Sequence, residues 1–317
     1  MKILADGTNS LSVGNPTNLG NSVGPIIKDA DEKLLRALTE LEEGEEWLVK
    51  PKILNNSNLW TPGIKINVQP NSWTHMNEWF GPVLGIMKAP NLKKSIEWQN
   101  ATEYGLTAGL HSLSTKECNY WLKNVEAGNL YINRPITGAV VKRQPFGGWK
   151  KSSFGSTVKA GSSFYPGVFK RYDEVKDYDM LVSKLEELWN IKSKKIKNDD
   201  LQSEHNYSVL YPHKKVLIVK DEKPNPEFKK YLDSIKNIFR MTIDEIEFSK
   251  LEDNNSMDKY SLVRWLSREP APDWIYKHNF SVDTNHIVQN PQRELFSWTR
   301  EQSVSITNHR YGNIGFS

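Results

Sequence analysis

Apolar residues in the first half of the chain switch repeatedly between strand-like and helix-like spacing. The expected succession is a buried strand at Val83 to Met87, a helix at 91–100, a strand at 106–113 and a strand at 129–133. Short connections between such strands predict parallel neighbours joined by right-handed crossovers, because a hairpin cannot join parallel strands. The expected fold class is therefore α/β with a parallel doubly wound sheet.

A capping box predicts a further helix between the last two of these strands. In Ser114-Thr-Lys-Glu117 the serine hydroxyl can accept from the amide at the third helical position, and the glutamate can reach back to the cap amide. We expect this helix to run to Glu126 and to be ended by Gly128. Upstream, the leucines between Asp31 and Glu43 share one face and predict an amphipathic helix.

The pattern changes after about Tyr172. Charged helix-like segments lead into an Asn-, Lys- and Asp-rich stretch at 192–208, which is typical of a linker. Val216 to Val219 predicts a strand, Asn225-Pro226 predicts a helix start, and one more helix is expected from about Gln292. The expected domains are 1–172, a helical segment and linker at 173–208, and a smaller appended α/β region at 209–317.

Composition narrows the class of protein. The 317 residues are 38% hydrophobic and 25% charged, as in globular chains that bury a core. The net charge of +4 gathers in lysines near residues 192–197, beside acidic residues, which favours a solvated linker over nucleic-acid binding. We expect no membrane span, because the apolar runs are short. For the same reason we expect a cytoplasmic location. The single cysteine excludes an internal disulfide framework and suits a reducing compartment.

Common catalytic signatures are missing from the sequence. The seven histidines show no metal-ligand spacing, and no HExxH or Cys/His cluster occurs, so no metal site is expected. No GxGxxG or GxxxxGK[ST] loop is found for phosphates, and no GxSxG elbow is found for a serine nucleophile.

Cys118 is the only residue that could carry thiolate chemistry within this chain. It shares a helical face with Trp121, Leu122 and Val125, which places the sulfur among apolar residues. Burial raises the pKa of a thiol, and no histidine lies in the same helix to activate it. We therefore interpret Cys118 as structural.

Two loops could bind a ligand. Glu78 and Phe80 precede a strand, and spacing alone would make Glu78 a surface acid and Phe80 a core ring. A carboxylate can, however, accept hydrogen bonds from ribose hydroxyls while an aromatic ring packs on a flat heterocycle. The segment 133–155 follows a strand's carboxyl end, where open sheets bind ligands. Around Gly138 and Ala139 it offers backbone amides that suit a carboxylate, and Phe146 precedes a glycine hinge. Composition alone favours ordinary turns here.

Three longer stretches carry a family resemblance. They read EWFGPVLGIM at 78–87, NATEYGLTAGLHSL at 100–113 and AGNLYINRPITGAVVKRQPFGGWKKSSFG at 127–155. These stretches resemble the aldehyde dehydrogenase superfamily. More narrowly they are similar to its L-glutamate γ-semialdehyde (1-pyrroline-5-carboxylate) dehydrogenase branch. The segments around Trp47, Trp60 and Gly63 resemble the dehydrogenase module of bifunctional proline-utilisation enzymes. The fold implied is part of the catalytic domain of that family.

The resemblance also implies roles for individual residues. Glu78 would hold the nicotinamide ribose of NAD, and Phe80 would pack beside the nicotinamide. Gly138 and Ala139 would bind the substrate's α-carboxylate, and Phe146 would form a wall around its aliphatic stem. The implied reaction is the oxidation of glutamate γ-semialdehyde to glutamate, with a thiolate nucleophile and hydride transfer to NAD.

The match begins partway into the family pattern. The stretch LSVGNPTNLGNSVGPII at 11–27 resembles the part that follows the nucleophilic cysteine, so the nucleophile and the nucleotide-binding domain lie upstream of the point matching Met1. The expectation is a C-terminal portion that is catalytically incomplete alone. Its expected partner is an N-terminal dehydrogenase or proline dehydrogenase polypeptide, or another copy of the chain. The alternatives are a non-catalytic assembly or regulatory module and a degenerate paralogue without a ligand.

Overall fold

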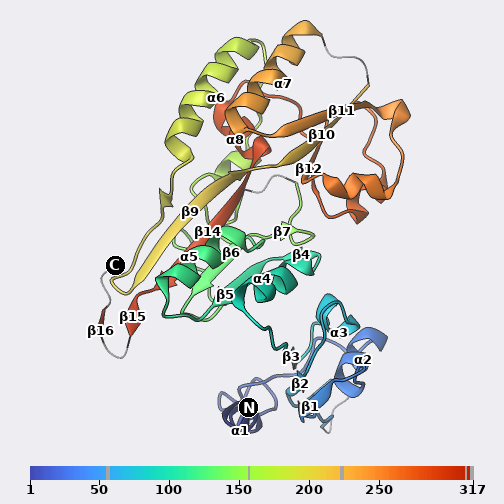
Figure 1. Cartoon of the computed structure of the whole chain (residues 1–317), viewed down its shortest axis with the longest axis vertical. Helices are drawn as coiled ribbons and strands as arrows, with labels where there is room; N and C mark the ends of the chain where they lie inside the picture. The colour runs from blue at the N-terminus through green and yellow to red at the C-terminus, as the bar shows by residue number, and fades with distance from the viewer. Residues whose placement is uncertain (55–57, 156–157, 222–224, 311–312, 315–317) are drawn as a thin grey trace. The chain divides into compact units, whose positions relative to one another are not determined.

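Two units, Met1–Thr102 and Glu103–Ser317, make up the chain (Figure 1). The structure is a computed structural model, and it describes all residues except 55–57, 156–157, 222–224, 311–312 and 315–317. Among the described residues, none of the helices combines the length and the apolar character that crossing a lipid bilayer requires.

The first unit is built on a three-stranded sheet in the order β1-β2-β3, with β1 antiparallel and β3 parallel to β2. Its elements are α1 (Lys2–Asn9), α2 (Glu32–Thr39), β1 (Glu46–Val49), β2 (Gly63–Ile66), α3 (Trp73–Met76), β3 (Val83–Gly85) and α4 (Leu92–Ala101). Helix α2 begins where the Asp31 side chain accepts from the Leu34 amide. Leu34 and Leu38 then pack against Trp60 in the core of this unit.

The strand expected at 83–87 is shorter than predicted and has different neighbours. It pairs with β2 in the first unit, whereas the strands expected at 106–113 and 129–133 belong to a sheet of the second unit. Its Leu84 side chain is 50% exposed, so the prediction of a buried strand is wrong. A short apolar run signals a strand but carries no information about its partner.

The second unit contains a five-stranded sheet in the order β5-β6-β14-β9-β8. Its strands are β5 (Thr107–Leu110), β6 (Asn129–Ile132), β8 (Ile196–Lys197), β9 (Glu204–Pro212) and β14 (Thr299–Thr307). Strands β5, β6 and β14 are parallel, and β9 is antiparallel to β14 along its whole length. Figure 1 shows β9 and β14 as two long neighbouring strands that lead from the appended region to β6.

The crossover from β5 to β6 is confirmed, and it passes through α5 (Thr115–Asn124). The Ser114 hydroxyl accepts from the Glu117 amide at 3.3 Å, as the capping box predicts. The second half of the capping box is wrong, because the Glu117 carboxylate accepts from the Ser112 hydroxyl at 2.5 Å instead of the cap amide. The helix ends at Asn124, two residues earlier than expected.

A second, all-parallel sheet in the order β11-β10-β12-β13 forms the appended α/β region. Its strands are β10 (Lys215–Lys220), β11 (Thr242–Glu247), β12 (Leu262–Trp265) and β13 (Ser281–Asp283), and its helices are α6 (Tyr178–Lys192), α7 (Pro226–Phe239) and α8 (Pro291–Trp298). Val216 and Ile218 pack with the three helices, whereas Leu217 and Val219 belong to a separate core cluster. Burial on both faces explains the unbroken apolar run of β10.

Sequence signals for two of these helices are confirmed. The Asn225 side chain accepts from the Phe228 amide ahead of α7, with proline at the first helical position. Helix α8 begins at Pro291, next to the position expected. Strand β9, however, begins at Glu204 inside the stretch predicted as a linker, and β14 was not predicted. The domain limits at 172 and 208 stay predictions.

The remaining elements are short. They are β4 (Tyr104–Gly105), β7 (Trp149–Lys150), β15 (His309–Arg310), β16 (Asn313–Ile314) and the 3₁₀ helices Tyr165–Phe169, Phe248–Lys250, Asn255–Lys259 and Asp273–Lys277. Strand β4 pairs with β7, and β15 pairs with β16, in separate two-stranded sheets.

Candidate functional site

The candidate substrate loop leaves the sheet at the carboxyl end of β6. Asn133 has a φ of 57°, and its side chain holds the neighbouring β5 end: its Nδ2 donates to the Ser112 carbonyl at 3.0 Å, and its Oδ1 accepts from the Ser112 amide at 3.0 Å. These contacts turn the chain out of the sheet. The following residues therefore lie at the edge where open sheets bind ligands.

Gly138 and Ala139 lie exposed in this loop. Gly138 has a φ of 80°, which favours glycine, and a Cβ at this position would meet nothing within 4 Å. Neither amide donates a hydrogen bond to any other part of the described chain, whereas the next amide, that of Val140, donates to Gln144 Oε1 at 2.9 Å. Two successive main-chain NH groups are thus open to an anion. Their predicted role in carboxylate binding stays a prediction.

Phe146 lines a cavity in the second unit. Its amide donates to the Ala160 carbonyl at 2.8 Å, and its side chain is 37% exposed. The cavity measures about 480 Å³, and its other walls include Phe154, Tyr276 and Arg293. Phe154 and Tyr276 stack with ring centroids 5.8 Å apart. This position is compatible with the predicted aromatic wall, which stays a prediction.

Glu78 and Phe80 belong to the first unit, between α3 and β3. Both side chains are exposed, that of Phe80 to 81%, so the interpretation of Phe80 as a core ring is wrong. Phe80 also has a φ of 53°, a conformation that bulky residues rarely adopt. A Cβ on Gly81 would lie 2.2 Å from a Leu34 methyl carbon, so glycine lets this turn approach α2 closely. The carboxylate and the ring are accessible to a ligand; their cofactor roles stay predictions.

Cys118 lies half-buried on α5, beside the buried Trp121. Its thiol approaches the Ser112 carbonyl at 3.8 Å. Burial, followed by the charge of Glu117, raises the pKa of the thiol above its usual range. A raised pKa disfavours the thiolate and supports the structural interpretation.

Lys159 is a buried lysine under the loop that sequence reasoning missed. Its Nζ donates to the carbonyls of Gly128 and Gly147 and, at 3.1 Å, to Asn129 Oδ1. Burial lowers the pKa of Lys159 to about 7, and the nearby carboxylate of Glu301 partly offsets this shift. The same burial raises the pKa of Glu301. Lys159 and Glu301 are far apart in the sequence, so no local spacing predicts that they pair.

Gln144 and Glu204 form a second buried link that sequence reasoning missed. Gln144 is 3% exposed, and its Nε2 donates to Glu204 Oε1 at 2.7 Å and to Asn206 Oδ1 at 3.0 Å. Both partners lie on β9. The start of β9 lies in the stretch predicted as a linker, so the sequence did not indicate that Glu204 and Asn206 face the loop. The only signal of a buried polar contact was the polar residue Gln144 within the loop.

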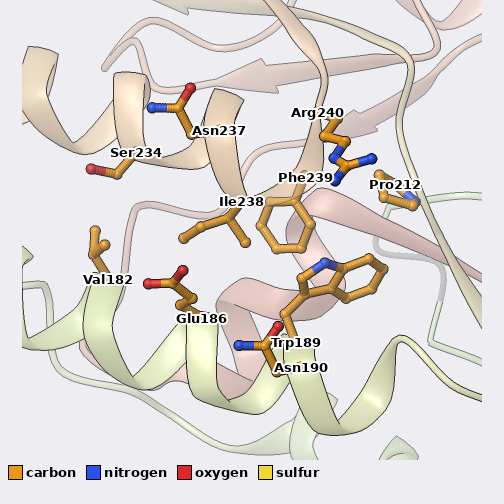
Figure 2. A pocket seen from close by; sticks show the side chains of 10 residues that line it. All are labelled: Val182, Glu186, Trp189, Asn190, Pro212, Ser234, Asn237, Ile238, Phe239 and Arg240. Carbon is orange, nitrogen blue, oxygen red and sulfur yellow. The ribbon is translucent and has the colours of Figure 1, made fainter.

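Another hollow, of about 610 Å³, lies between α6 and α7. Figure 2 shows the side chains that line it. Trp189 packs edge-on against Phe239, with ring centroids 5.1 Å apart, and Glu186 and Arg240 lie around them. None of the predicted site residues lines it. Among the residues that the structure describes, no group of three or more His, Cys, Asp or Glu side chains is placed to hold a metal ion.

Comparisons with known proteins bear on this arrangement. The model of the aldehyde dehydrogenase family matches residues 1–169. The chain is 35% identical over 160 residues to the 1-pyrroline-5-carboxylate dehydrogenase of Bacillus subtilis (strain 168), covering 50% of this chain and 31% of that protein. It is 34% identical over 158 residues to 1-pyrroline-5-carboxylate dehydrogenase 1 of Halalkalibacterium halodurans, covering 49% of this chain and 30% of that protein.

A solved structure extends the likeness beyond the family match. Proline utilization A from Corynebacterium freiburgense is 37% identical, with a TM-score of 0.85, over 98% of this chain and 34% of that one. The appended region is therefore part of the likeness. The chain spans about a third of the length of each of these relatives. The family match and the shared α/β fold confirm the resemblance, and the chain belongs to the aldehyde dehydrogenase family.

Proposed function

We propose that this chain supplies the substrate-carboxylate site of an NAD-dependent L-glutamate γ-semialdehyde (1-pyrroline-5-carboxylate) dehydrogenase. The observation that carries the proposal is the pair of exposed amides at Gly138 and Ala139, which donate to nothing else in the described chain. The names of the relatives, two of which are 1-pyrroline-5-carboxylate dehydrogenases, support the same reaction.

The chemistry of the loop suits a small aldehyde that bears a carboxylate. Two adjacent NH groups can donate to a carboxylate in charge-assisted hydrogen bonds, which are stronger than those between neutral groups. Phe146 borders a cavity that neither Gly138 nor Ala139 lines, and it would offer an apolar face to the aliphatic stem. An aldehyde without the carboxylate would leave these donors unpaired, so the loop favours the carboxylated substrate.

The cofactor part of the proposal concerns Glu78 and Phe80. An exposed carboxylate and an exposed ring fit the ribose hydroxyls and the flat nicotinamide of NAD. NAD would accept the hydride that leaves the substrate. The residues of this chain would bind and orient that end of the cofactor.

The nucleophile is proposed to come from a different polypeptide segment. Cys118 is the only cysteine, and its raised pKa and its place on α5 argue against it as a nucleophile. An N-terminal dehydrogenase or proline dehydrogenase polypeptide would supply the nucleophile. Another copy of this chain, which also has only Cys118, would be a partner in assembly alone. The likeness to proline utilization A from Corynebacterium freiburgense favours the first of these. The predicted cytoplasmic location stays a prediction.

The test is to combine the chain with an N-terminal polypeptide that carries the family cysteine and nucleotide-binding domain, and to follow NADH absorbance with glutamate γ-semialdehyde. We expect turnover with the wild-type chain and its loss with Gly138→Trp, which blocks the carboxylate site. Leu113→Trp is the matched control, since Leu113 is 71% exposed and lies outside the loop, and it should leave turnover intact. A correctly assembled pair without turnover would favour the non-catalytic assembly module instead.

A further inference from the structure

Both polar groups of the Gln144 side chain, the oxygen and the nitrogen, are hydrogen-bonded within the second unit. Its carbonyl oxygen accepts from the Val140 amide at 2.9 Å, and its amide nitrogen donates to Glu204 Oε1 at 2.7 Å and Asn206 Oδ1 at 3.0 Å. One side chain thus joins the candidate substrate loop to strand β9. With 3% exposure the contact is nearly free of water, where hydrogen bonds are electrostatically stronger.

The partners of Gln144 are themselves fixed. Glu204 Oε1 also accepts from Asn206 Nδ2 at 2.8 Å, and Glu204 Oε2 accepts from Arg134. Arg134 in turn donates to Ser305 Oγ on β14 at 2.5 Å. The Glu204 carboxylate is thus paired with two arginines, because Arg143 Nη1 also lies 3.9 Å from Glu204 Oε1. A largely buried network of this kind restricts the arrangement of its members.

We propose that Gln144 is the positioning residue of the substrate loop, held in place by Glu204 and Asn206. Its side-chain oxygen accepts from the Val140 amide and so fixes the peptide that directly follows Gly138 and Ala139. The amides of Gly138 and Ala139 are left free to donate to the substrate's carboxylate. Preorganised donors bind an anion without a further loss of conformational freedom. This inference rests on the proposed function and assigns the appended strands a part in substrate recognition.

The local turn alone does not provide this fixation. The amides of Arg143 and Gln144 both donate to the Val140 carbonyl, at 3.0 and 2.9 Å, which closes the turn from its carbonyl side. Only the Gln144 side chain fixes the amide of Val140, on the side facing Gly138 and Ala139. Removing that side chain should therefore loosen the loop while the sheet stays intact.

The first test compares Gln144→Ala with Gln202→Ala, an exposed glutamine two residues before β9. Hydrogen exchange of the full chain is followed by mass spectrometry on the peptide covering 134–146. We expect Gln144→Ala to speed exchange in this peptide by about tenfold, because one buried hydrogen-bond set is lost. Peptides from β9 and β14 should exchange as in the wild type, and Gln202→Ala should change neither.

The second test uses the enzyme assembled with its N-terminal polypeptide. Gln144→Ala should raise KM for glutamate γ-semialdehyde about tenfold and leave kcat within about twofold, since it weakens carboxylate binding and not the chemical step. A purely structural role would instead lower the amount of active enzyme and leave KM unchanged. That result, or unchanged exchange at 134–146, overturns the positioning role while leaving the proposed function standing.

A charge exchange keeps the proposal falsifiable if Gln144→Ala folds poorly. Gln144→Glu alone places a carboxylate against Glu204 and should raise KM at least as much as Gln144→Ala. Adding Glu204→Gln restores a donor and acceptor pair across the same contact and should recover most of the loss. A double variant no better than Gln144→Glu alone would contradict the direct link between the two side chains.

Discussion

At the scale of single residues, both loops of interest contain a residue with positive φ. Gly138 and Phe80 have φ values of 80° and 53°, one in the substrate loop and one in the proposed cofactor clamp. Glycine adopts this conformation freely, whereas a phenylalanine does so at a cost of about 1 to 2 kcal/mol. The strained and exposed Phe80 is compatible with the proposed contact with a ligand.

Gly138→Ala tests whether the backbone geometry at this position serves substrate binding. Gly44→Ala is a matched control, because Gly44 has a φ of 79° and equally open surroundings. Both changes should cost about 1 kcal/mol of unfolding free energy in urea titrations, through the strain on the new side chain. Only Gly138→Ala should raise KM for glutamate γ-semialdehyde, by about fivefold. Equal KM values for the two variants would argue against the loop.

At the scale of elements, the sequence predicted the features that depend on neighbouring residues, such as helix caps. The caps of α5 and α7 lie where the sequence placed them, because each depends on a side chain bonding an amide three residues away. The pairing of β14 with β6 and β9 could not be predicted, since nothing in the local spacing of one strand specifies a partner far along the chain. The Gln144 and Glu204 contact depends on that pairing and was missed for the same reason.

His213, between β9 and β10, makes the appended region sensitive to acid. Burial, followed by the charge of Arg300, lowers its pKa from 6.5 to about 3. Between these values the unfolded chain binds a proton that the folded chain does not, so stability falls as the pH drops below 6.5. At pH 5 the loss should be about 2 kcal/mol.

Urea unfolding at pH 8 and pH 5 measures this effect. His213→Gln should remove about 2 kcal/mol from the difference between the two pH values. The exposed His111→Gln should keep the wild-type difference. A difference that is the same in all three proteins would contradict the assignment to His213.

Glu294 on α8 neutralises a buried arginine in the same region. Its Oε2 accepts from Arg264 at 3.1 Å and from the Tyr231 hydroxyl at 3.2 Å, and Arg264 is wholly buried. Glu294→Ala should cost about 3 to 5 kcal/mol of unfolding free energy, because it leaves a buried charge short of a partner. The exposed Glu187→Ala on α6 should stay within about 0.5 kcal/mol of the wild type, and equal costs would refute the account.

At the scale of the whole molecule, the second unit joins family and appended residues in one sheet. Strands β9 and β14 continue the sheet of β5 and β6, and then lead to the parallel sheet of β10 to β13. Under the candidate loop, the same two strands provide Glu204, Glu301 and the hydroxyl of Ser303, which donates to the Pro145 carbonyl at 2.5 Å. The appended region is thereby tied to the proposed carboxylate site by direct contacts.

The central claim is that the amides of Gly138 and Ala139 bind the substrate's α-carboxylate. The most direct measurement labels the glycine and alanine amides of this chain with nitrogen-15, assembles the enzyme, and titrates it with the product glutamate or with 4-aminobutyrate, which lacks the α-carboxylate. Saturable downfield shifts of both amide protons with glutamate, and not with 4-aminobutyrate, are the predicted result. Unmoved Gly138 and Ala139 resonances at saturating glutamate, or equal shifts with both ligands, would contradict it.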